Sequence, residues 1–384
     1  MTFNALAQSL VDYKYIDNDV EIMSWTTRKL EILKVVRDSR CDIICLQEID
    51  EADYHDFFVA EFKALGYSVI YKKKLQNRLD GIAVLYRPSR FKLLVQRDVE
   101  FSSEHGQYDK PQVALVVALE DVNSDVYIVS NTHLLFNKNR GDIKAYQLLM
   151  LLNVINEFKA ELRERNPIVL MCGDFNITPQ SLLYSFLDEG VAVLKNSNPK
   201  RISGQYLMFD ETYLTSSAGH SDAGSTVGSF KHYADDVYGN VKNAKLPRED
   251  EEEEETEQEM EWYIELRNKH SQLFKGDGVV LTATEASTDE TDPEHSILLS
   301  PLVLKSAYNR DADVEDMKAE PAYTAYHGWQ RGCVDYIWYD PQQLVVEAIY
   351  EMPLYKRVRA GGNLPNKHWP SSDHFSLISQ FKRG

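Results

Sequence analysis

Apolar segments of strand length recur along this chain, and their order constrains the fold more than any other feature. Nine such segments are rich in β-branched and aromatic residues, as strands are. They lie at residues 41–48, 67–71, 81–87, 113–119, 126–134, 167–174, 333–339, 344–352 and 374–381. Several early segments follow one another after short turns, whereas a parallel sheet would alternate strands with helices. We therefore expect a four-layer α/β sandwich, in which two facing mixed or antiparallel β-sheets are flanked by helices.

Three segments have the periodicity of amphipathic helices. They lie at residues 26–38, 52–65 and 142–163. In the first helix, Leu30, Leu33 and Val36 form one stripe, which we expect to face the core. In the last, the stripe consists of Ile143, Leu149, Leu152, Ile155 and Phe158. The middle helix is expected to end at Gly66, because glycine is common directly after a helix.

The chain has the size of one large domain. Its 384 residues, 43% of them hydrophobic, can bury a full core, so we predict a single domain over residues 1–384. From about residue 197 to 322 the strand pattern disappears and then resumes, which indicates an insertion rather than a second domain. Residues 248–261 within it are strongly acidic, and we expect them to form a disordered, solvated loop.

The net charge and the cysteines bear on partners and location. A formal charge of −18 argues at first against a nucleic-acid partner, but much of it is concentrated at 249–261. No segment is long and apolar enough for a membrane span, and no signal peptide is recognisable. Cys41, Cys45, Cys172 and Cys333 lack metal spacing, and we interpret them as reduced core residues. We expect an intracellular protein, with the cytoplasm favoured and the nucleus or mitochondrion left open.

Polar side chains stand where several of the expected strands end or begin. The clusters are Gln47 and Glu48; Asn131, Thr132 and His133; Gly173, Asp174, Phe175 and Asn176; Asp335; and Asp373 with His374. In an antiparallel arrangement the end of one strand and the start of its neighbour lie on the same rim, so these clusters can converge. Each alone is explained as a turn or surface residue. Together they offer carboxylate, amide and imidazole groups, which suit a hard cation such as Mg²⁺ or Mn²⁺.

Six short motifs occur along the chain in a fixed order. They are MTFNALAQ, CLQE, NTHL, GDFN, VDYIWY and SSDHF. In this order they resemble the motif set of the endonuclease/exonuclease/phosphatase superfamily of Mg²⁺-dependent phosphoesterases. Within it, the chain resembles the branch that holds carbon-catabolite-repressor-type deadenylases, nocturnin and the Angel proteins. The segment 131–152, with YSFL and ISGQ downstream, is most similar to the Angel group. The resemblance covers about residues 1–205 and 322–384.

The resemblance implies a metal site. Glu48 would be the main protein ligand of Mg²⁺, or of Mn²⁺, and Asn4 would lie beside it. Asp373 would also lie near the metal. Whether the site holds one ion or two stays open.

The resemblance also implies catalytic roles. Asp174 would orient or deprotonate the attacking water, and Asn176 would donate its amide to the phosphate. His374 would contact the phosphate and stabilise charge in the transition state, with Asp335 holding its ring in one tautomer. His133 would be a second phosphate contact. Either Asp174 or His374 could be the general base.

The implied substrate is an RNA 3′ end, with two chemistries open. One is the trimming of poly(A) tails, and the other is the removal of 2′,3′-cyclic phosphates to leave a free diol, which the Angel-like segments favour. A phosphatase of a small phosphodiester is a further alternative, because the fold hosts several substrate classes. We expect substrate contacts from Asn131, Arg140 and Phe136.

Basic and aromatic side chains near the rim would support RNA binding. The basic candidates are Lys72, Lys73, Lys74 and Arg78; Lys138, Arg140 and Lys144; and Lys356, Arg357 and Arg359. Each of them could equally be solvated surface. Phe175 and Trp338 could stack on an unpaired base or belong to the core, and Phe175 is expected to point inward.

A different class of hypothesis is a catalytically weak scaffold. Such an adaptor would bind proteins of mRNA decay or translation through the insertion at 197–322. In either case we expect a monomer without membrane contact. Met1 falls inside the expected first strand, which makes a shortened chain one interpretation of this N-terminus.

Overall fold

The computed structural model describes residues 1–11, 19–101, 109–193, 202–205, 297–309, 320–328 and 330–384. The acidic loop expected at 248–261 lies outside these residues. Within the described ranges, no helix is both long enough and apolar enough to cross a membrane.

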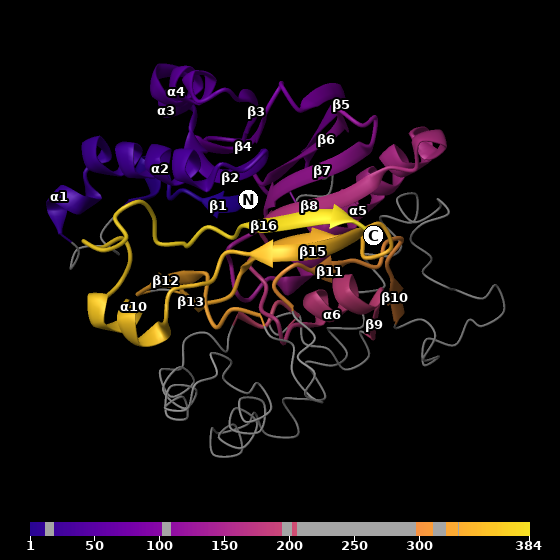
Figure 1. Ribbon diagram of the computed structural model, residues 1–384. Coiled ribbons are helices and arrows are strands. Elements are labelled where there is room, and N and C mark those ends of the chain that lie inside the picture. The colour runs from indigo at the N-terminus through magenta and orange to yellow at the C-terminus, as the bar shows by residue number, and fades with distance from the viewer. Residues whose placement is uncertain (12–18, 102–108, 194–201, 206–296, 310–319, 329) are drawn as a thin grey trace, which may run out of the picture.

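The first sheet has four strands and lies in the upper left of Figure 1. Its strands are β1 (Thr2–Asn4), β2 (Ile43–Asp50), β3 (Ser68–Lys73) and β4 (Asp80–Tyr86), in the order β1-β2-β4-β3. β1 runs parallel to β2, and the other pairs are antiparallel.

The second sheet has six strands, in the order β11-β14-β8-β7-β6-β5. These are β11 (Lys305–Ser306), β14 (Asp335–Tyr339), β8 (Ile168–Asp174), β7 (Val126–His133), β6 (Val113–Asp121) and β5 (Phe91–Glu100). Only β7 and β8 pair in parallel. Both sheets are therefore mixed, as the strand order along the sequence predicts.

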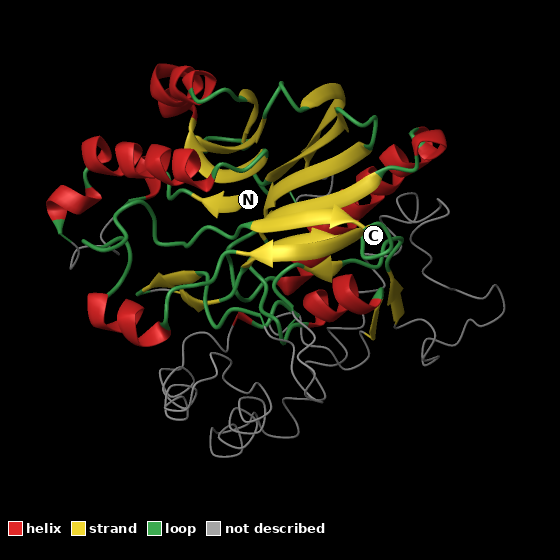
Figure 2. Ribbon diagram, in the orientation of Figure 1, coloured by secondary structure: helices red, strands yellow, loops and turns green. Residues whose placement is uncertain are grey.

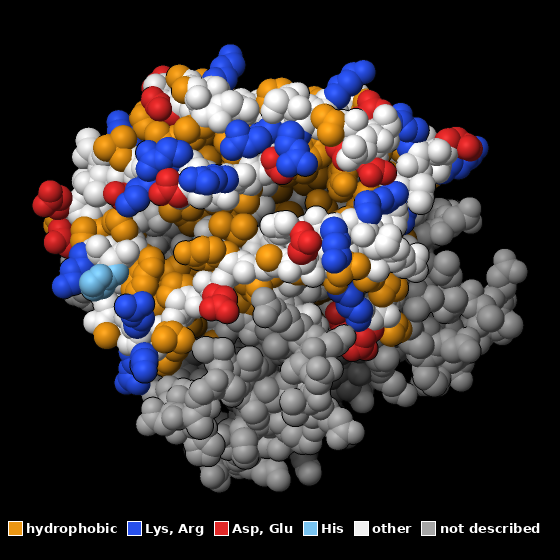
Figure 3. Space-filling model, in the orientation of Figure 1, with side chains coloured by type: hydrophobic (Ala, Val, Ile, Leu, Met, Phe, Trp, Pro, Cys, Tyr) orange, Lys and Arg blue, Asp and Glu red, His pale blue; other side chains and the backbone are white. Residues whose placement is uncertain are grey.

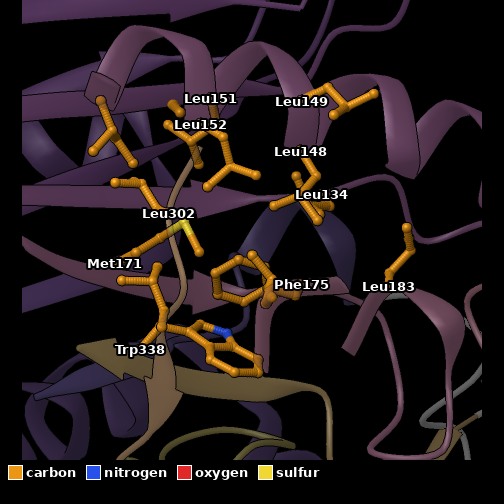
Figure 4. Packing of buried hydrophobic residues seen from close by; sticks show 14 of the residues in the cluster. Leu134, Leu148, Leu149, Leu151, Leu152, Met171, Phe175, Leu183, Leu302 and Trp338 are labelled. Atoms are coloured by element: carbon orange, nitrogen blue, oxygen red, sulfur yellow. The ribbon is translucent and has the colours of Figure 1, made fainter. Parts of the chain in front are cut away.

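The two sheets pack face to face, with helices on both outer faces (Figure 2). Val84 of β4, Val117 of β6 and Val129 of β7 belong to one buried cluster between the sheets. α2 (Trp25–Ser39) and α4 (Val59–Ala64) cover the other face of the four-stranded sheet. α5 (Gly141–Glu161) and α6 (Leu182–Glu189) cover the six-stranded sheet (Figure 4). This confirms the four-layer α/β sandwich.

The remaining elements lie outside the two main sheets and their covering helices. They are α1 (Val20–Met23), α3 (Glu51–Asp53), a π-helix (Tyr54–Phe58), short 3₁₀ turns (Gln8–Leu10 and Arg163–Arg165), α10 (Tyr355–Gly361) and three two-stranded ribbons. The ribbons pair β9 (Val191–Val193) with β10 (Ile297–Leu299), β12 (Ala325–His327) with β13 (Gln330–Gly332), and β15 (Leu344–Ile349) with β16 (Ser379–Arg383).

Two expectations about these elements need correction. In α2 the expected stripe is wrong for Leu30, which is 55% exposed, whereas Val36 is fully buried and Leu33 packs against the same core. Ser24 caps the helix, and Ile32 and Val36 are the apolar residues that face the core. The strand expected at 374–381 begins only at Ser379, since before it only His374 and Leu377 make isolated bridges, to Ala325 and Thr2. In α5, by contrast, all five residues of the expected stripe are buried.

The described part of the expected insertion belongs to the same fold. Lys305 and Ser306 form β11, an edge strand of the six-stranded sheet. Residues 202–205 are buried and pack near the end of β8. The expected insertion at 197–322 therefore includes short pieces that complete the domain.

Candidate active site

Three side chains from three adjacent strands form one row across the six-stranded sheet. In the parallel pair β7 and β8, His133 lies opposite Asp174, and in the antiparallel pair β8 and β14, Asp174 lies opposite Asp335. β7 and β8 end at this rim, whereas β14 begins there. The strand directions thus bring together residues that are far apart in the sequence.

The sequence Gly173-Asp174-Phe175-Asn176 makes the sharp turn that ends β8. A Cβ atom at Gly173 would lie 2.1 Å from the carbonyl oxygen of Thr132, so only glycine lets β8 approach β7 this closely. Asp174 Oδ1 accepts the backbone N–H of Asn176 at 3.0 Å, and Asn176 adopts a left-handed φ of 50°, which asparagine tolerates. Phe175 is fully buried between the leucines of α5 and Trp338, which anchors the turn (Figure 4).

Glu48 reaches the same rim from the facing sheet by means of a β-bulge. The register between β2 and β4 shifts between Gln47 and Ile49, and Glu48 itself has a φ of 56°. A bulge of this kind inserts one extra residue and redirects its side chain. The carboxylate of Glu48 therefore projects from the rim, with its side chain 12% exposed.

Asn4 joins the carboxylates of the two sheets. Its Nδ2 donates to Glu48 Oε1 and to Asp174 Oδ2, both at 3.0 Å. Its Oδ1 accepts the backbone N–H of Leu6, which fixes the orientation of the amide. Asn4 thus lies beside Glu48 as expected, and it holds the two carboxylates close together.

Lys74 forms a buried charged network with His133. Its Nζ lies 2.6 Å from Asp80 Oδ2 and 3.2 Å from His133 Nδ1. Burial, Lys74 and His374 together hold the pKa of His133 well below its usual value, so the ring is neutral at pH 7. Its Nε2 lies 3.6 Å from Asp174 Oδ2.

His374 faces Asp174 from the other side and is paired with Asp335. Its Nδ1 lies 2.8 Å from Asp335 Oδ2, and its Nε2 lies 4.0 Å from Asp174 Oδ2. Burial lowers the pKa of His374, but Asp335, Asp373 and Asp174 outweigh burial and raise it well above the usual range. His374 is therefore an imidazolium at neutral pH, with Nε2 facing Asp174.

The carboxylates of the site carry more negative charge than the neighbouring cations neutralise. Burial, followed by repulsion from Asp335, raises the pKa of Asp174 to about 7, although His374 and Asn4 lower it. Burial also raises the pKa of Glu48, against the opposing effect of Lys74, and Asp373 adds to the increase. Such a site favours the binding of a further cation.

The donor set fits a divalent metal ion. Two groups of described residues have ligand atoms within 4.8 Å of one another, namely His327, Asp373 and His374, and Asp174, Asp335 and His374. Both groups include His374, whereas the motif resemblance implies Glu48 as the main metal ligand. Nδ1 of His374 is already engaged by Asp335, and hard cations prefer carboxylate oxygens to ring nitrogens.

The three expected substrate contacts lie in other environments than the row of His133, Asp174 and Asp335, which is called the catalytic row below. Asn131 is fully buried, where it accepts from Gln47 Nε2 at 2.7 Å and donates to the carbonyls of Leu46 and Ala83. Its amide ties the two sheets together through these three hydrogen bonds. Arg140 directly precedes α5 and pairs with Asp142 in its first turn, and Phe136 is 43% exposed.

The basic candidates fall into three environments. Lys72 and Lys73 pair with acidic residues of neighbouring elements on the surface, and only Lys74 enters the site. Lys144 is fully buried and donates to the backbone carbonyl of Asn176 at 2.8 Å. Burial lowers its pKa well below the usual value, despite nearby Asp174 and Asp142.

Three side chains near the catalytic row were not singled out from the sequence. Gln205 and Gln330 both donate to Asn176 Oδ1, at 3.0 and 3.2 Å. His327 Nε2 lies 3.6 Å from Asp373 Oδ2. Gln205 could have been found from the Angel-like motif ISGQ, in which it is the last residue. The three-residue strands around His327 and Gln330 are too short to show a periodic pattern.

Comparisons with known proteins agree with the motif order. The family model described as Endonuclease/Exonuclease/phosphatase family matches residues 1–374. Protein angel homolog 2 of Bos taurus is 36% identical over 215 residues, which cover 53% of this chain and 39% of that protein. Carbon catabolite repressor protein 4 homolog 3 of Arabidopsis thaliana is 27% identical over 392 residues, covering 99% of this chain and 74% of that protein. The chain thus spans about two-fifths of the length of the angel homologue.

One solved structure is similar over nearly the whole chain. It is the crystal structure of ANGEL2, described as a 2′,3′-cyclic phosphatase, in complex with adenosine-2′,3′-vanadate. The TM-score is 0.70 at 26% identity, and the comparison covers 99% of this chain and 94% of that chain. The four-layer fold is therefore common to both.

Proposed function

Because the chain belongs to the Endonuclease/Exonuclease/phosphatase family, we propose that it is a Mg²⁺-dependent phosphoesterase that removes 2′,3′-cyclic phosphates from RNA 3′ ends. The observation that carries this proposal is the row of His133, Asp174 and Asp335, with His374 against it. The likeness to the ANGEL2 cyclic phosphatase, which extends over nearly all of both chains, supports the substrate class.

Glu48 would hold the metal ion, with Asn4 beside it and Asp373 nearby. When bound, a divalent cation would neutralise phosphate charge and make a coordinated water more acidic. Asn4 supports this assignment, since its amide donates at 3.0 Å to both Glu48 and Asp174 and so holds the metal ligand next to the base. The raised pKa of Glu48 supports it as well, because a carboxylate that is costly to ionise in a buried site gains most from a bound cation.

Asp174 is the general base in this proposal, and His374 is the cation that contacts the phosphate. A pKa of about 7 lets Asp174 take a proton from water at neutral pH. The pKa of His374 is raised well above its usual value by Asp335, so this ring is already protonated and cannot accept a proton. Its Nε2–H is then a donor to a phosphate oxygen where negative charge develops.

His133 and Asn176 would complete the phosphate contacts. The Nε2 atom of neutral His133 faces Asp174 at 3.6 Å. Asn176 is held on three sides, since Nδ2 donates to the carbonyl of Leu134 and Oδ1 accepts from Gln205 and Gln330. The second N–H of its amide is the group that would reach the phosphate.

The surface around α10 supports a polyanionic substrate. Lys356, Arg357 and Arg359 are exposed on this helix. Figure 3 shows Lys and Arg side chains gathered on this part of the molecule, despite the net charge of −18. These cations can contact RNA phosphates upstream of the 3′ end.

The test uses two end-labelled RNAs, one with a 2′,3′-cyclic phosphate and one with an adenosine tail. Each is incubated with the full chain and Mg²⁺, and then with Mg²⁺ and excess chelator. We expect loss of the cyclic phosphate at unchanged chain length, and only in the presence of free Mg²⁺. Asp174→Ala and His374→Ala should each remove most of the turnover while leaving the folded protein intact.

The other outcomes have clear meanings. Stepwise shortening of the tail would replace the proposal with a 3′ exonuclease of the deadenylase type, the second chemistry that the motif resemblance implies. No Mg²⁺-dependent change in either RNA would contradict an RNA 3′-end phosphoesterase. Near-normal turnover in Asp174→Ala would contradict the assignment of the base.

A further inference from the structure

The β12–β13 hairpin is fastened to the loop that carries His374. The backbone N–H of Tyr326 donates to the carbonyl of Asp373 at 2.9 Å, and that of Phe375 donates to the carbonyl of Thr324 at 2.8 Å. These two hydrogen bonds flank the bridge between Ala325 and His374 and fix the spacing of the two segments. The position of His327 relative to His374 is therefore set by main-chain contacts.

One face of this hairpin is directed toward the catalytic row. Side chains alternate along a strand, so Tyr326 and His327 point in opposite directions. Tyr326 packs into a separate aromatic cluster with Tyr323 and Phe375. His327 consequently projects into the site, where its Nε2 lies 3.6 Å from Asp373 Oδ2.

The cross-strand neighbour of His327 reaches the opposite side of the same site. His327 and Gln330 are directly paired in the hairpin, so their side chains share one face. Gln330 Nε2 donates to Asn176 Oδ1 at 3.2 Å. Both side chains are nearly fully buried. The hairpin thus touches Asp373 on one side and Asn176 on the other, and it forms a wall of the site.

Two imidazole rings meet at this wall. The ring centroids of His327 and His374 lie 6.5 Å apart, with an angle of 33° between the planes. His374 is engaged by Asp335 through Nδ1. His327 therefore places a second imidazole next to His374, the proposed phosphate contact.

The proposed reaction needs donors at two different ribose oxygens. In the first hydrolysis, water adds to phosphorus, one P–O bond to the ribose breaks, and the released oxygen gains a proton to become a hydroxyl. The product is a phosphate monoester on the other ribose oxygen. In the second hydrolysis, another water adds, the remaining P–O bond breaks, and that oxygen gains a proton. The products are inorganic phosphate and the diol.

We propose that His327 is a further substrate-contacting residue, which donates a hydrogen bond to the ribose edge and holds the monoester in place for the second hydrolysis. This rests on the proposed cyclic phosphatase function. Gln330 is a positioning residue that keeps the hairpin against Asn176.

The experiment follows both steps with RNAs that end in a 2′,3′-cyclic phosphate, a 2′-phosphate or a 3′-phosphate. His327→Leu removes the donor at similar volume, His327→Gln keeps a donor, and His55→Leu changes an exposed histidine as the matched control. Mass spectrometry of the RNA end separates cyclic phosphate, monoester and diol. Thermal melting checks that each variant is folded.

We expect His327→Leu to accumulate monoester, with turnover of the monoester lowered about tenfold, the loss of one hydrogen bond of ordinary strength. Opening of the cyclic phosphate should stay within about threefold of the unchanged chain, a split that a merely structural role would not produce. His327→Gln should recover part of the second step, and His55→Leu should match the unchanged chain. Gln330→Ala, which removes one donor to Asn176 Oδ1, should slow both steps.

Three results would overturn the inference. One is an equal loss of both steps in His327→Leu and His327→Gln at unchanged melting temperature. Another is a His327→Leu variant that forms diol as fast as the unchanged chain. If His327→Leu does not fold, the third is the absence of any monoester accumulation in His327→Gln. An unchanged chain that leaves the cyclic phosphate intact would instead refute the proposed function itself.

Discussion

The ammonium group of Lys74 lies 3.2 Å from Nδ1 of His133 in the interior of the site. An ammonium can only donate, so Nδ1 must accept, and the proton of this neutral ring resides on Nε2. Nε2 is the nitrogen that faces Asp174, at 3.6 Å. Lys74 therefore determines which nitrogen of His133 is the donor in the site.

Replacing Lys74 by methionine should change the tautomer of His133. We expect Nδ1 to become partly protonated, and the pKa of His133 to rise, because the lysine charge that lowers it is gone. The loss of a partner for buried Asp80 should also destabilise the protein by about 3–5 kcal/mol. The ¹⁵N shifts of the ring report the tautomer. Lys74→Gln, which keeps a donor, and Lys73→Met, in a half-exposed pair, should leave it unchanged.

Asp335→Asn should shift the pH profile of turnover toward acid. Asp335 raises the pKa of both His374 and Asp174, so its neutralisation lowers both values. The acidic limb, which reports deprotonation of Asp174, and the basic limb, which reports loss of the His374 proton, should move in the same direction. Measured turnover from pH 5 to 9 tests this expectation. A shift of the basic limb alone would contradict the coupling of Asp335 to Asp174.

The strand order and the convergence of the polar clusters could be predicted from the sequence. A polar residue directly after an apolar strand lies at a sheet rim, and the directions of β7, β8 and β14 then bring His133, Asp174 and Asp335 together. The six ordered motifs indicated the family, which the match over residues 1–374 confirms. The roles assigned to these residues stay predictions.

Other features depended on tertiary structure that the sequence does not encode locally. Lys72, Lys73 and Lys74 are the same residue type in succession, and only the end of β3 decides that Lys74 turns inward. Asn131 stands at a strand end as His133 does, but it lies deeper, where both sheets use its amide. His327 belongs to a hairpin too short for any periodic pattern.

Mg²⁺ should stabilise the protein more at high pH than at low pH. The folded pKa of Asp174 is about 7, above its unfolded value near 3.8, so the folded state binds this proton more tightly. Its contribution to stability is complete below the unfolded pKa and is lost as pH rises toward 7. A metal ion at Glu48 binds more tightly beside ionised Asp174 than beside the neutral acid, and at about 100 times the Kd a single site adds about 2.7 kcal/mol.

Thermal melting with and without Mg²⁺ at pH 5 and pH 8 measures this difference. We expect a small increase of Tm at pH 5 and a larger one at pH 8, since protons compete with the ion at the acidic value. Glu48→Gln should reduce the increase at pH 8. An increase of equal size at both pH values would contradict competition between protons and the metal ion.

Arg28 should be essential for the geometry of the site although it lies outside it. The side chain is fully buried, and its guanidinium donates to the carbonyls of Ala5 at 2.8 Å and Ser371 at 3.2 Å, and also to Leu6. These carbonyls flank Asn4 and the loop that carries Asp373. Arg28 therefore ties the end of β1 to the C-terminal segment.

Arg28→Met keeps the apolar stem but leaves these buried carbonyls without a donor, at about 1–3 kcal/mol for each group. We expect a decrease of about 3–5 kcal/mol in the free energy of unfolding in urea, together with lower turnover at temperatures where the variant is still folded. Lys34→Met, which removes an exposed i,i+3 pair on the same helix, should cost no more than about 0.5 kcal/mol. If the two variants were equally stable, the carbonyls around Arg28 would have to be satisfied by water instead, and the link between β1 and the C-terminal segment would not depend on this side chain.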